Sequence, residues 1–300
     1  MKLSDLGQLP FILPGNPENI LWNSCKWPEI QNFIMENGLS GYYYVLLKNE
    51  SLVPSHLKTV WQSEYFRTAL LNEEFKKQLE TIGSLASLRN EKLIAIKGIY
   101  LAYQSYSSCG MRAMTDVDIL VDNNFFESAE VVFSNFGFVA YKKETARELA
   151  PAELKDKMFV RGNCIFDVQR LLINEAFDSD FFKNAIESEK KGLYFPAVEN
   201  HLVFLCWHFL KHFSKEKVRY SAIIDIALSL QIHRETIEWG RFWQLAGFTG
   251  KESDIRKLLS EIRVCFNLRL TFDQGEPEND INLQDKKKQS FSYLRSVLEN

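Results

Sequence analysis

The stretch from Glu91 to Leu172 constrains the fold most, because its apolar residues come in short runs and not at helical spacing. The run Lys92–Lys97 is apolar between charged ends, and Thr115–Val121 is rich in β-branched residues, so both favour β-strands. We expect helices from Gly98 to Tyr106 and from Asn123, a plausible N-cap, to about Phe136. The sequence therefore predicts a small mixed α/β unit.

The second half of this stretch adds further strands. Phe138–Tyr141 is predicted to be a strand, and a charged connection follows over residues 142–155. The segments Lys157–Arg161 and Cys164–Leu172 are typical of a hairpin that turns at Gly162-Asn163.

Helical periodicity dominates on both sides. Before the α/β stretch it covers Trp27–Tyr44 and Ser55–Asn90, and after Asn174 it returns as far as Leu268. The prediction is an α+β fold in which a small mixed sheet is flanked by N-terminal and C-terminal helical regions. The expected limits are 1–90 for the N-terminal helical region, 91–172 for the α/β core, 173–270 for the C-terminal helical region and 271–300 for an acidic linker with a terminal helix.

Charge and cysteine usage limit the function classes. With 36 Lys+Arg against 39 Asp+Glu, the net charge of −3 gives no strong nucleic-acid signature. Five scattered cysteines without a C-x-x-C pair are typical of a reducing compartment, and no stretch has the length of a signal peptide or a membrane span. We expect a cytoplasmic protein that is complete at its N-terminus and does not act at a membrane.

Asp116 and Asp118 are the strongest chemical signal. On a strand, side chains two residues apart point to the same face about 6.5 to 7 Å apart, so both carboxylates are expected to project together while Val117, Ile119 and Val121 face the core. Hard oxygen ligands at this spacing suit Mg²⁺ that bridges to phosphate oxygens. The alternative is that both side chains lie on a solvated strand face.

Asp167 is a candidate third carboxylate, since it lies in a second apolar strand, Ile165–Gln169. Its alternative role is structural, as a turn cap or a partner of Arg170. Lys97 and Arg112 are the cations most suited to face phosphate, Arg through a bidentate fork and Lys as a point charge. Alternatively, Lys97 is an exposed strand end and Arg112 an ion-pair partner of the paired aspartates.

The run Ile94-Ala-Ile-Lys-Gly98, together with Arg112 four residues before Asp116-Val-Asp-Ile-Leu-Val121, resembles the uncharacterised nucleotidyltransferase family of the polymerase β-like superfamily. The resemblance extends to the acidic strand Phe166-Asp-Val-Gln169 and to a later helix with paired histidines, His208 and His212. It covers about Trp27 to Phe248.

The resemblance implies that Asp116, Asp118 and Asp167 hold two Mg²⁺ ions, that Asp167 helps to deprotonate the acceptor hydroxyl, and that a nucleoside monophosphate moves from an NTP with release of pyrophosphate. Lys97, Gly98 and Arg112 would contact the nucleotide. Members of the superfamily commonly have Gly-Ser or Gly-Gly where this chain has Gly98-Ile99, so a hydroxyl contact to phosphate from the second position is absent. Gly98 still allows close backbone approach.

His208 and His212 share one helix face at i, i+4 spacing. They either pack and hydrogen-bond within the helical layer or line a pocket for the acceptor, which is an unknown small molecule, protein or RNA. A thiol nucleophile at Cys164 is conceivable, but a buried hydrophobic cysteine is the simpler interpretation. The leading hypothesis is a Mg²⁺-dependent nucleotidyltransferase. The alternatives are a catalytically silent nucleotide-binding or scaffold protein of this fold, and the nucleotidyltransferase member of a toxin–antitoxin pair.

Overall fold

The computed structural model describes residues 13, 26–141, 155–213, 219–268 and 270. The chain divides into two compact units. One unit comprises Phe66–His201, and the other comprises Met1–Tyr65 together with Leu202–Asn300. The expected acidic linker, the terminal helix and the charged connection over 142–154 lie outside the described residues.

The unit of Phe66–His201 contains one seven-stranded mixed sheet with the order β3-β4-β5-β2-β1-β7-β6. Two neighbouring pairs are parallel, β2 with β5 and β1 with β7, and the other four are antiparallel. The strands are β1 (Leu93–Ala95), β2 (Val117–Val121), β3 (Val139–Tyr141), β4 (Asp156–Arg161), β5 (Cys164–Gln169), β6 (Ile186–Glu187) and β7 (Leu193–Phe195).

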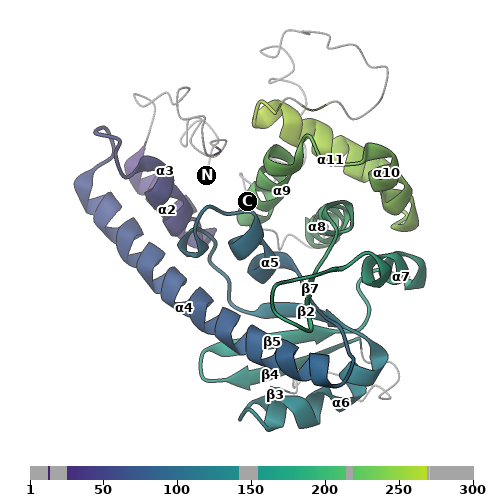
Figure 1. Cartoon of the computed structure of the whole chain (residues 1–300). Coiled ribbons are helices and arrows are strands. Elements are labelled where there is room, and N and C mark those ends of the chain that lie inside the picture. The colour runs from purple at the N-terminus through teal and green to yellow at the C-terminus, as the bar shows by residue number, and fades with distance from the viewer. Residues whose placement is uncertain (1–12, 14–25, 142–154, 214–218, 269, 271–300) are drawn as a thin grey trace. The chain divides into compact units, whose positions relative to one another are not determined.

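Helices accompany the sheet in the same unit, and Figure 1 shows α6 beside β3. They are the second half of α4 (Ser55–Leu88), α5 (Lys97–Gln104), a short 3-10 turn (Cys109–Met111), α6 (Asn123–Ser134) and α7 (Glu175–Lys183). The predicted fold class, a mixed sheet with flanking helical regions, is confirmed.

The alternation of β2 and β5 separates an apolar face from a polar one. Val117, Ile119 and Val121 are fully buried, as predicted, and join one hydrophobic core with Phe166 and Val168 of β5. Helices α4 and α6 supply the opposing apolar side chains, including Phe75, Leu79, Phe125 and Phe133. The polar residues of both strands therefore point away from this core.

The other unit is helical in its described residues. It contains α2 (Trp27–Glu36), α3 (Ser40–Leu47), the first turns of α4, most of α8 (Val198–Phe213), α9 (Ser221–His233), α10 (Trp239–Phe248) and α11 (Glu252–Cys265). Segments far apart in sequence meet here, since the backbone N–H of Tyr220 donates to Asn37 Oδ1 at 2.6 Å and the ring of Tyr220 packs on Phe33. None of the helices in the described ranges is long and apolar enough to span a membrane.

Three sequence predictions need correction. Helix α6 is capped by Asp122 and not by Asn123, because the Asp122 carboxylate accepts the N–H of Phe125 at 2.8 Å. The predicted helix over 27–44 is broken at Gly38, which has a φ of 65°. Strands β6 and β7 were not predicted, since they are only 2 and 3 residues long and too short for a visible alternation.

Candidate active site

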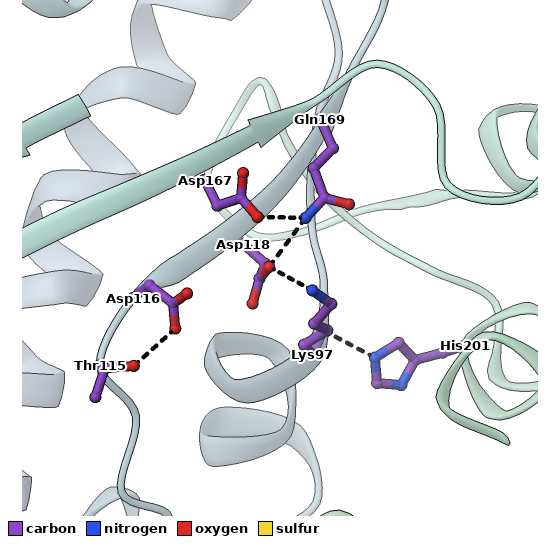
Figure 2. Close-up of polar contacts among 7 residues, drawn as sticks. All are labelled: Lys97, Thr115, Asp116, Asp118, Asp167, Gln169 and His201. Atoms are coloured by element: carbon purple, nitrogen blue, oxygen red, sulfur yellow. Dashed lines mark hydrogen bonds and ion pairs between the residues drawn. The ribbon is translucent and has the colours of Figure 1, made fainter. Parts of the chain in front are cut away.

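Strand pairing places two of the predicted carboxylates side by side. In the parallel pair of β2 and β5, Asp118 is the register partner of Asp167. Both residues alternate with core residues, so both carboxylates project from the same face of the sheet (Figure 2). Two residues separated by 49 positions in sequence are thus brought to one point.

Two nitrogen atoms hold the Asp118 carboxylate. Lys97 Nζ lies 2.6 Å from Asp118 Oδ1, and Gln169 Nε2 donates to the same oxygen at 3.0 Å. Gln169 Nε2 also donates to Asp167 Oδ2 at 2.7 Å, so one amide group bridges both carboxylates. The second oxygen of Asp167, Oδ1, is buried and accepts no hydrogen bond from any residue that the structure describes. This unpaired buried acceptor is an unusual feature in a folded protein.

Asp116 lies one residue before β2 and not within it, which corrects the predicted strand. The pairing of β2 with β5 begins at Val117, so no neighbouring strand extends to Asp116. Its Oδ1 accepts a hydrogen bond from Thr115 Oγ1 at 3.2 Å. Asp116 precedes Asp118 by two positions, and Figure 2 shows Asp116, Asp118 and Asp167 in one region.

Lys97 begins α5 in an uncommon backbone conformation. Its φ is 51°, a left-handed value that few residues other than glycine adopt. Its backbone N–H donates to His201 Nε2 at 3.0 Å, and its ammonium faces Asp118. Because only 19% of the Lys97 side chain is exposed, the alternative of a solvated strand end is wrong. Both ends of this residue are fixed.

Gly98 follows and allows α5 to approach the chain that precedes β2. A Cβ atom at this position would lie 3.3 Å from Met114 Cβ, which is tighter than an ordinary contact. A larger residue would push α5 away from the segment that carries Asp116.

Arg112 lies in the connection before β2. Its Nη1 donates to the carbonyl of Ala113, and its own carbonyl accepts Asn72 Nδ2 at 2.9 Å. The same amide donates to the carbonyl of Cys109 at 2.6 Å, so the fully buried Asn72 of α4 anchors this connection. Arg112 is close enough to Asp116 for its charge to lower the pKa of that carboxyl.

Burial and the neighbouring charge of Asp118 raise the pKa of two of the carboxyl groups, Asp116 and Asp167. Burial raises the pKa of Asp167 to about 7, with Asp118 as the next cause and Lys97 acting against it. The pKa of Asp116 is raised by burial and then by Asp118. For Lys97, burial alone would lower the pKa, but Asp118, Asp167 and Asp116 together raise it. The site therefore carries an excess of negative charge that a further cation would stabilise.

The remaining candidate residues of the sequence analysis are Cys164, the histidine pair and Arg170. Cys164 is buried at 4% exposure, and burial raises the pKa of its thiol to about 12, which excludes a thiolate nucleophile at neutral pH. His208 and His212 belong to the helical unit, and their rings lie 4.4 Å apart on α8. Arg170, the cation proposed as a partner of Asp167, lies 3.3 Å from Glu127.

Sequence reasoning assigned no role to Gln169, His201 or Asn72. Gln169 had a readable signal, because it stands two residues after Asp167 on a predicted strand and so shares its face. His201 and Asn72 are distant in sequence from the residues they hold, and their roles follow from tertiary contacts alone.

The donor set matches a hard cation in chemistry. Asp116, Asp118 and Asp167 lie in one region (Figure 2), and no donor among the described residues reaches Asp167 Oδ1. As arranged here, with Lys97 bonded to Asp118, no three His, Cys, Asp or Glu side chains of the described residues form a ready metal-binding group.

Comparison with known proteins gives a family and three structural likenesses. No curated protein matches. The solution structure of the antibiotic-resistance factor ANT(2'')-Ia is 12% identical over 60% of this chain and 96% of that chain, with a TM-score of 0.41. The crystal structure of ANT(2'')-Ia in complex with adenylyl-2''-tobramycin is 12% identical over 60% of this chain and 97% of that chain, with a TM-score of 0.39. The crystal structure of an antigenic nucleotidyltransferase-like protein from Paracoccidioides brasiliensis is 12% identical over 63% of this chain and 93% of that chain, with a TM-score of 0.37.

The family model described as uncharacterised nucleotidyltransferase matches residues 23–267 and thus most of the chain. This chain belongs to that family of nucleotidyltransferases.

Proposed function

We propose that this protein is a Mg²⁺-dependent nucleotidyltransferase that moves a nucleoside monophosphate from an NTP to a hydroxyl acceptor and releases pyrophosphate. The observation that carries the proposal is the convergence of Asp118 and Asp167 from adjacent parallel strands, with Asp167 Oδ1 left without a donor among the described residues. A buried acceptor of this kind is destabilising unless a ligand supplies its partner.

Asp116, Asp118 and Asp167 are the residues that would hold two Mg²⁺ ions. Their oxygen atoms are the ligands that this ion prefers. When bound, Mg²⁺ would neutralise the charge on the triphosphate and stabilise the attacking and leaving oxygens of an in-line displacement. Lys97 Nζ now pairs with Asp118, so the ammonium would be released to face phosphate as a metal binds.

The protein groups would act on the reactants as follows. Lys97 and Arg112 would bind phosphate oxygens, and Gly98 would admit the phosphates close to the backbone. Asp167 would take the proton of the acceptor hydroxyl. The acceptor oxygen then bonds to the α-phosphorus, the bond from the α-phosphorus to the β-phosphate oxygen breaks, and pyrophosphate leaves with that electron pair.

His208 and His212 are proposed to line the acceptor pocket, and the acceptor is a small molecule, a protein or an RNA. A cytoplasmic location, expected from the scattered cysteines, stays a prediction.

Thermal unfolding with ligands tests this proposal. The full chain is heated with each of the four NTPs, with Mg²⁺ or with EDTA, beside Asp118→Asn. A ligand at a hundredfold excess over its Kd adds about 2.7 kcal/mol of stability, which raises the Tm by a few degrees. The proposal predicts a Mg²⁺-dependent shift with at least one NTP that Asp118→Asn lacks, together with pyrophosphate release once an acceptor is supplied. If no nucleotide shifts the Tm, the proposal is wrong.

A second candidate is a nucleotide-binding protein of the same fold without turnover. The 2.6 Å ion pair between Lys97 and Asp118 favours it, because a permanent ammonium at this carboxylate would compete with a metal. This candidate predicts a Tm shift with an NTP that persists in EDTA, and no pyrophosphate release with any acceptor. The same titration therefore separates the two functions.

A further inference from the structure

Gln169 connects the two carboxylates of adjacent strands. Its Nε2 lies 3.0 Å from Asp118 Oδ1 and 2.7 Å from Asp167 Oδ2, so each amide hydrogen serves one carboxylate (Figure 2). The register accounts for this reach: Gln169 stands two positions after Asp167 on the same face of β5, and its register partner on β2 is Leu120, two positions after Asp118. The amide is therefore aimed back along both strands at once.

We propose that Gln169 is a positioning residue that sets the two carboxylates for a divalent cation. The inference rests on the proposed function, and it adds a residue outside the expected ligand set. By holding Asp167 through Oδ2, Gln169 fixes that carboxylate with Oδ1 bare. On Asp118 both Lys97 Nζ and Gln169 Nε2 bond to Oδ1, and neither of these two donors bonds to Oδ2. One oxygen on each strand is thus kept for a ligand.

The chemistry of an amide suits this task better than that of a charged or an apolar side chain. A Lys or Arg in this place would cancel one negative charge and compete with a divalent cation. An apolar residue would leave Asp118 and Asp167, which are register partners on adjacent strands, without a shared donor between their like charges. A neutral group with two donors holds both anions and leaves their charge intact.

Outer partners of this kind commonly matter for metal sites. A hydrogen bond from a second residue fixes the orientation of a ligating carboxylate, and its loss typically weakens metal affinity by roughly 10- to 100-fold. Gln169 would act in this way on two ligands at the same time.

Metal affinity in matched variants tests the inference. Free Mn²⁺ is measured by electron paramagnetic resonance during titration of the full chain without nucleotide, with Mg²⁺ as the competitor. Gln169→Met has nearly the same shape and no donor, and we expect its Mn²⁺ affinity to fall about tenfold or more. The control is Gln78→Met on α4, because Gln78 Nε2 also donates to a carboxylate, Glu74 Oε1, at 2.6 Å, but lies away from the site. We expect this control to bind Mn²⁺ as the wild type does.

The readout separates positioning from a structural role. A residue that only stabilises the fold would lower the Tm in EDTA and leave the Mn²⁺ affinity of the folded protein unchanged. A folded Gln169→Met variant that binds Mn²⁺ like the wild type therefore overturns the inference. Should that variant fail to fold by circular dichroism, Gln169→Asn decides, because its shorter amide reaches at most one carboxylate. Unchanged affinity in folded Gln169→Asn overturns the inference, and weakened affinity supports it.

The wild type and Asp118→Asn distinguish the inference from the function on which it rests. If the wild type binds no Mn²⁺, or if Asp118→Asn binds Mn²⁺ as tightly as the wild type does, the proposed metal site is wrong and so is the role proposed for Gln169. If the wild type binds Mn²⁺ at Asp118 and Gln169→Met binds it equally well, only the inference falls.

Discussion

Two carboxylates 11 positions apart in the chain, the half-buried Asp167 and the buried Asp178, meet the cost of burial in different ways. Burial raises the pKa of Asp167 to about 7 and that of Asp178 to about 6. Asp178, on α7, accepts the backbone N–H of Leu172 on Oδ2 at 2.7 Å and that of Ile173 on Oδ1 at 3.2 Å. Asp167 has the Gln169 amide on one oxygen, and no residue in the described ranges donates to the other.

The difference separates a structural carboxylate from a functional candidate. Both oxygens of Asp178 complete the hydrogen bonding of the chain that leaves β5, so the folded protein needs nothing more at this place. At Asp167 the fold leaves an acceptor bare, next to a second carboxylate that repels it. Among the described residues, an unpaired carboxylate oxygen beside a second carboxylate distinguishes Asp167 from Asp178, and burial or pKa alone does not.

The largest effect is expected from Asp167→Asn. Pyrophosphate release should fall by at least about a hundredfold, which is the upper end of the loss caused by removing even an outer partner of a metal. Stability should be retained or raised, because a buried charge that Asp118 repels is removed. A pyrophosphate assay and urea unfolding measure the two effects. An active Asp167→Asn enzyme would remove the distinction between the two carboxylates.

Asp178→Ala should show the opposite pattern. Two backbone N–H groups lose their acceptor, so the free energy of unfolding should fall by about 1–3 kcal/mol. Activity per folded molecule should stay near that of the wild type. Urea unfolding beside Ser179→Ala, an exposed neighbour on α7, measures the loss. A stable but inactive Asp178→Ala variant would place Asp178 with the functional carboxylates.

The pH dependence of stability sharpens the same contrast. The pKa of Asp178 is about 6 in the folded protein and about 3.9 in an unfolded chain, so the folded state binds the proton more tightly. Its contribution to stability is fully present below about pH 4 and is lost as the pH rises through 6. Asp178→Asn cannot titrate, so the stability of the wild type relative to this variant should decrease from pH 4 to 7, by at most about 3 kcal/mol.

Urea unfolding of both proteins at four pH values measures this difference, in which the carboxyl groups common to both proteins cancel. A difference that is constant across pH 4 to 7, or that grows in the other direction, would contradict the raised pKa of Asp178.

The smallest effect is expected from Cys164→Ala. The thiol is buried and its pKa is about 12, so it plays no part in chemistry near Asp167, although only two residues separate them. Pyrophosphate release should be unchanged, and stability should fall by about 1 kcal/mol through the lost packing. Loss of activity in a stable Cys164→Ala protein would restore the thiol as a candidate.

Much of this site was predictable from local patterns. The β-branched run that ends at Val121 predicted β2, and its alternation placed Asp118 opposite the core residues Val117 and Ile119. The same reasoning on β5 separated Asp167 from Phe166 and Val168. These predictions succeed because a side-chain period of two is a property of the strand itself.

Other features of the site could not be predicted from the sequence, because they depend on tertiary contacts. Strand limits depend on where partners begin, so Asp116 lies outside β2 because pairing with β5 starts at Val117. The left-handed backbone of Lys97 has no local signal, since it is sustained by contacts with Asp118 and with His201, 104 residues further on. A local sequence pattern does not indicate which distant residues contact a given position.

The sequence by itself determined the alternation of the strands, the helical periods around them, the family, and the types of residue available for chemistry, because these depend on neighbours a few positions apart. Tertiary structure alone decided that Asp118 stands in register with Asp167, that Gln169 bridges them, and that one oxygen of Asp167 remains bare. Register arises from strand pairing over long separations, where the packing of the whole sheet fixes which residues meet.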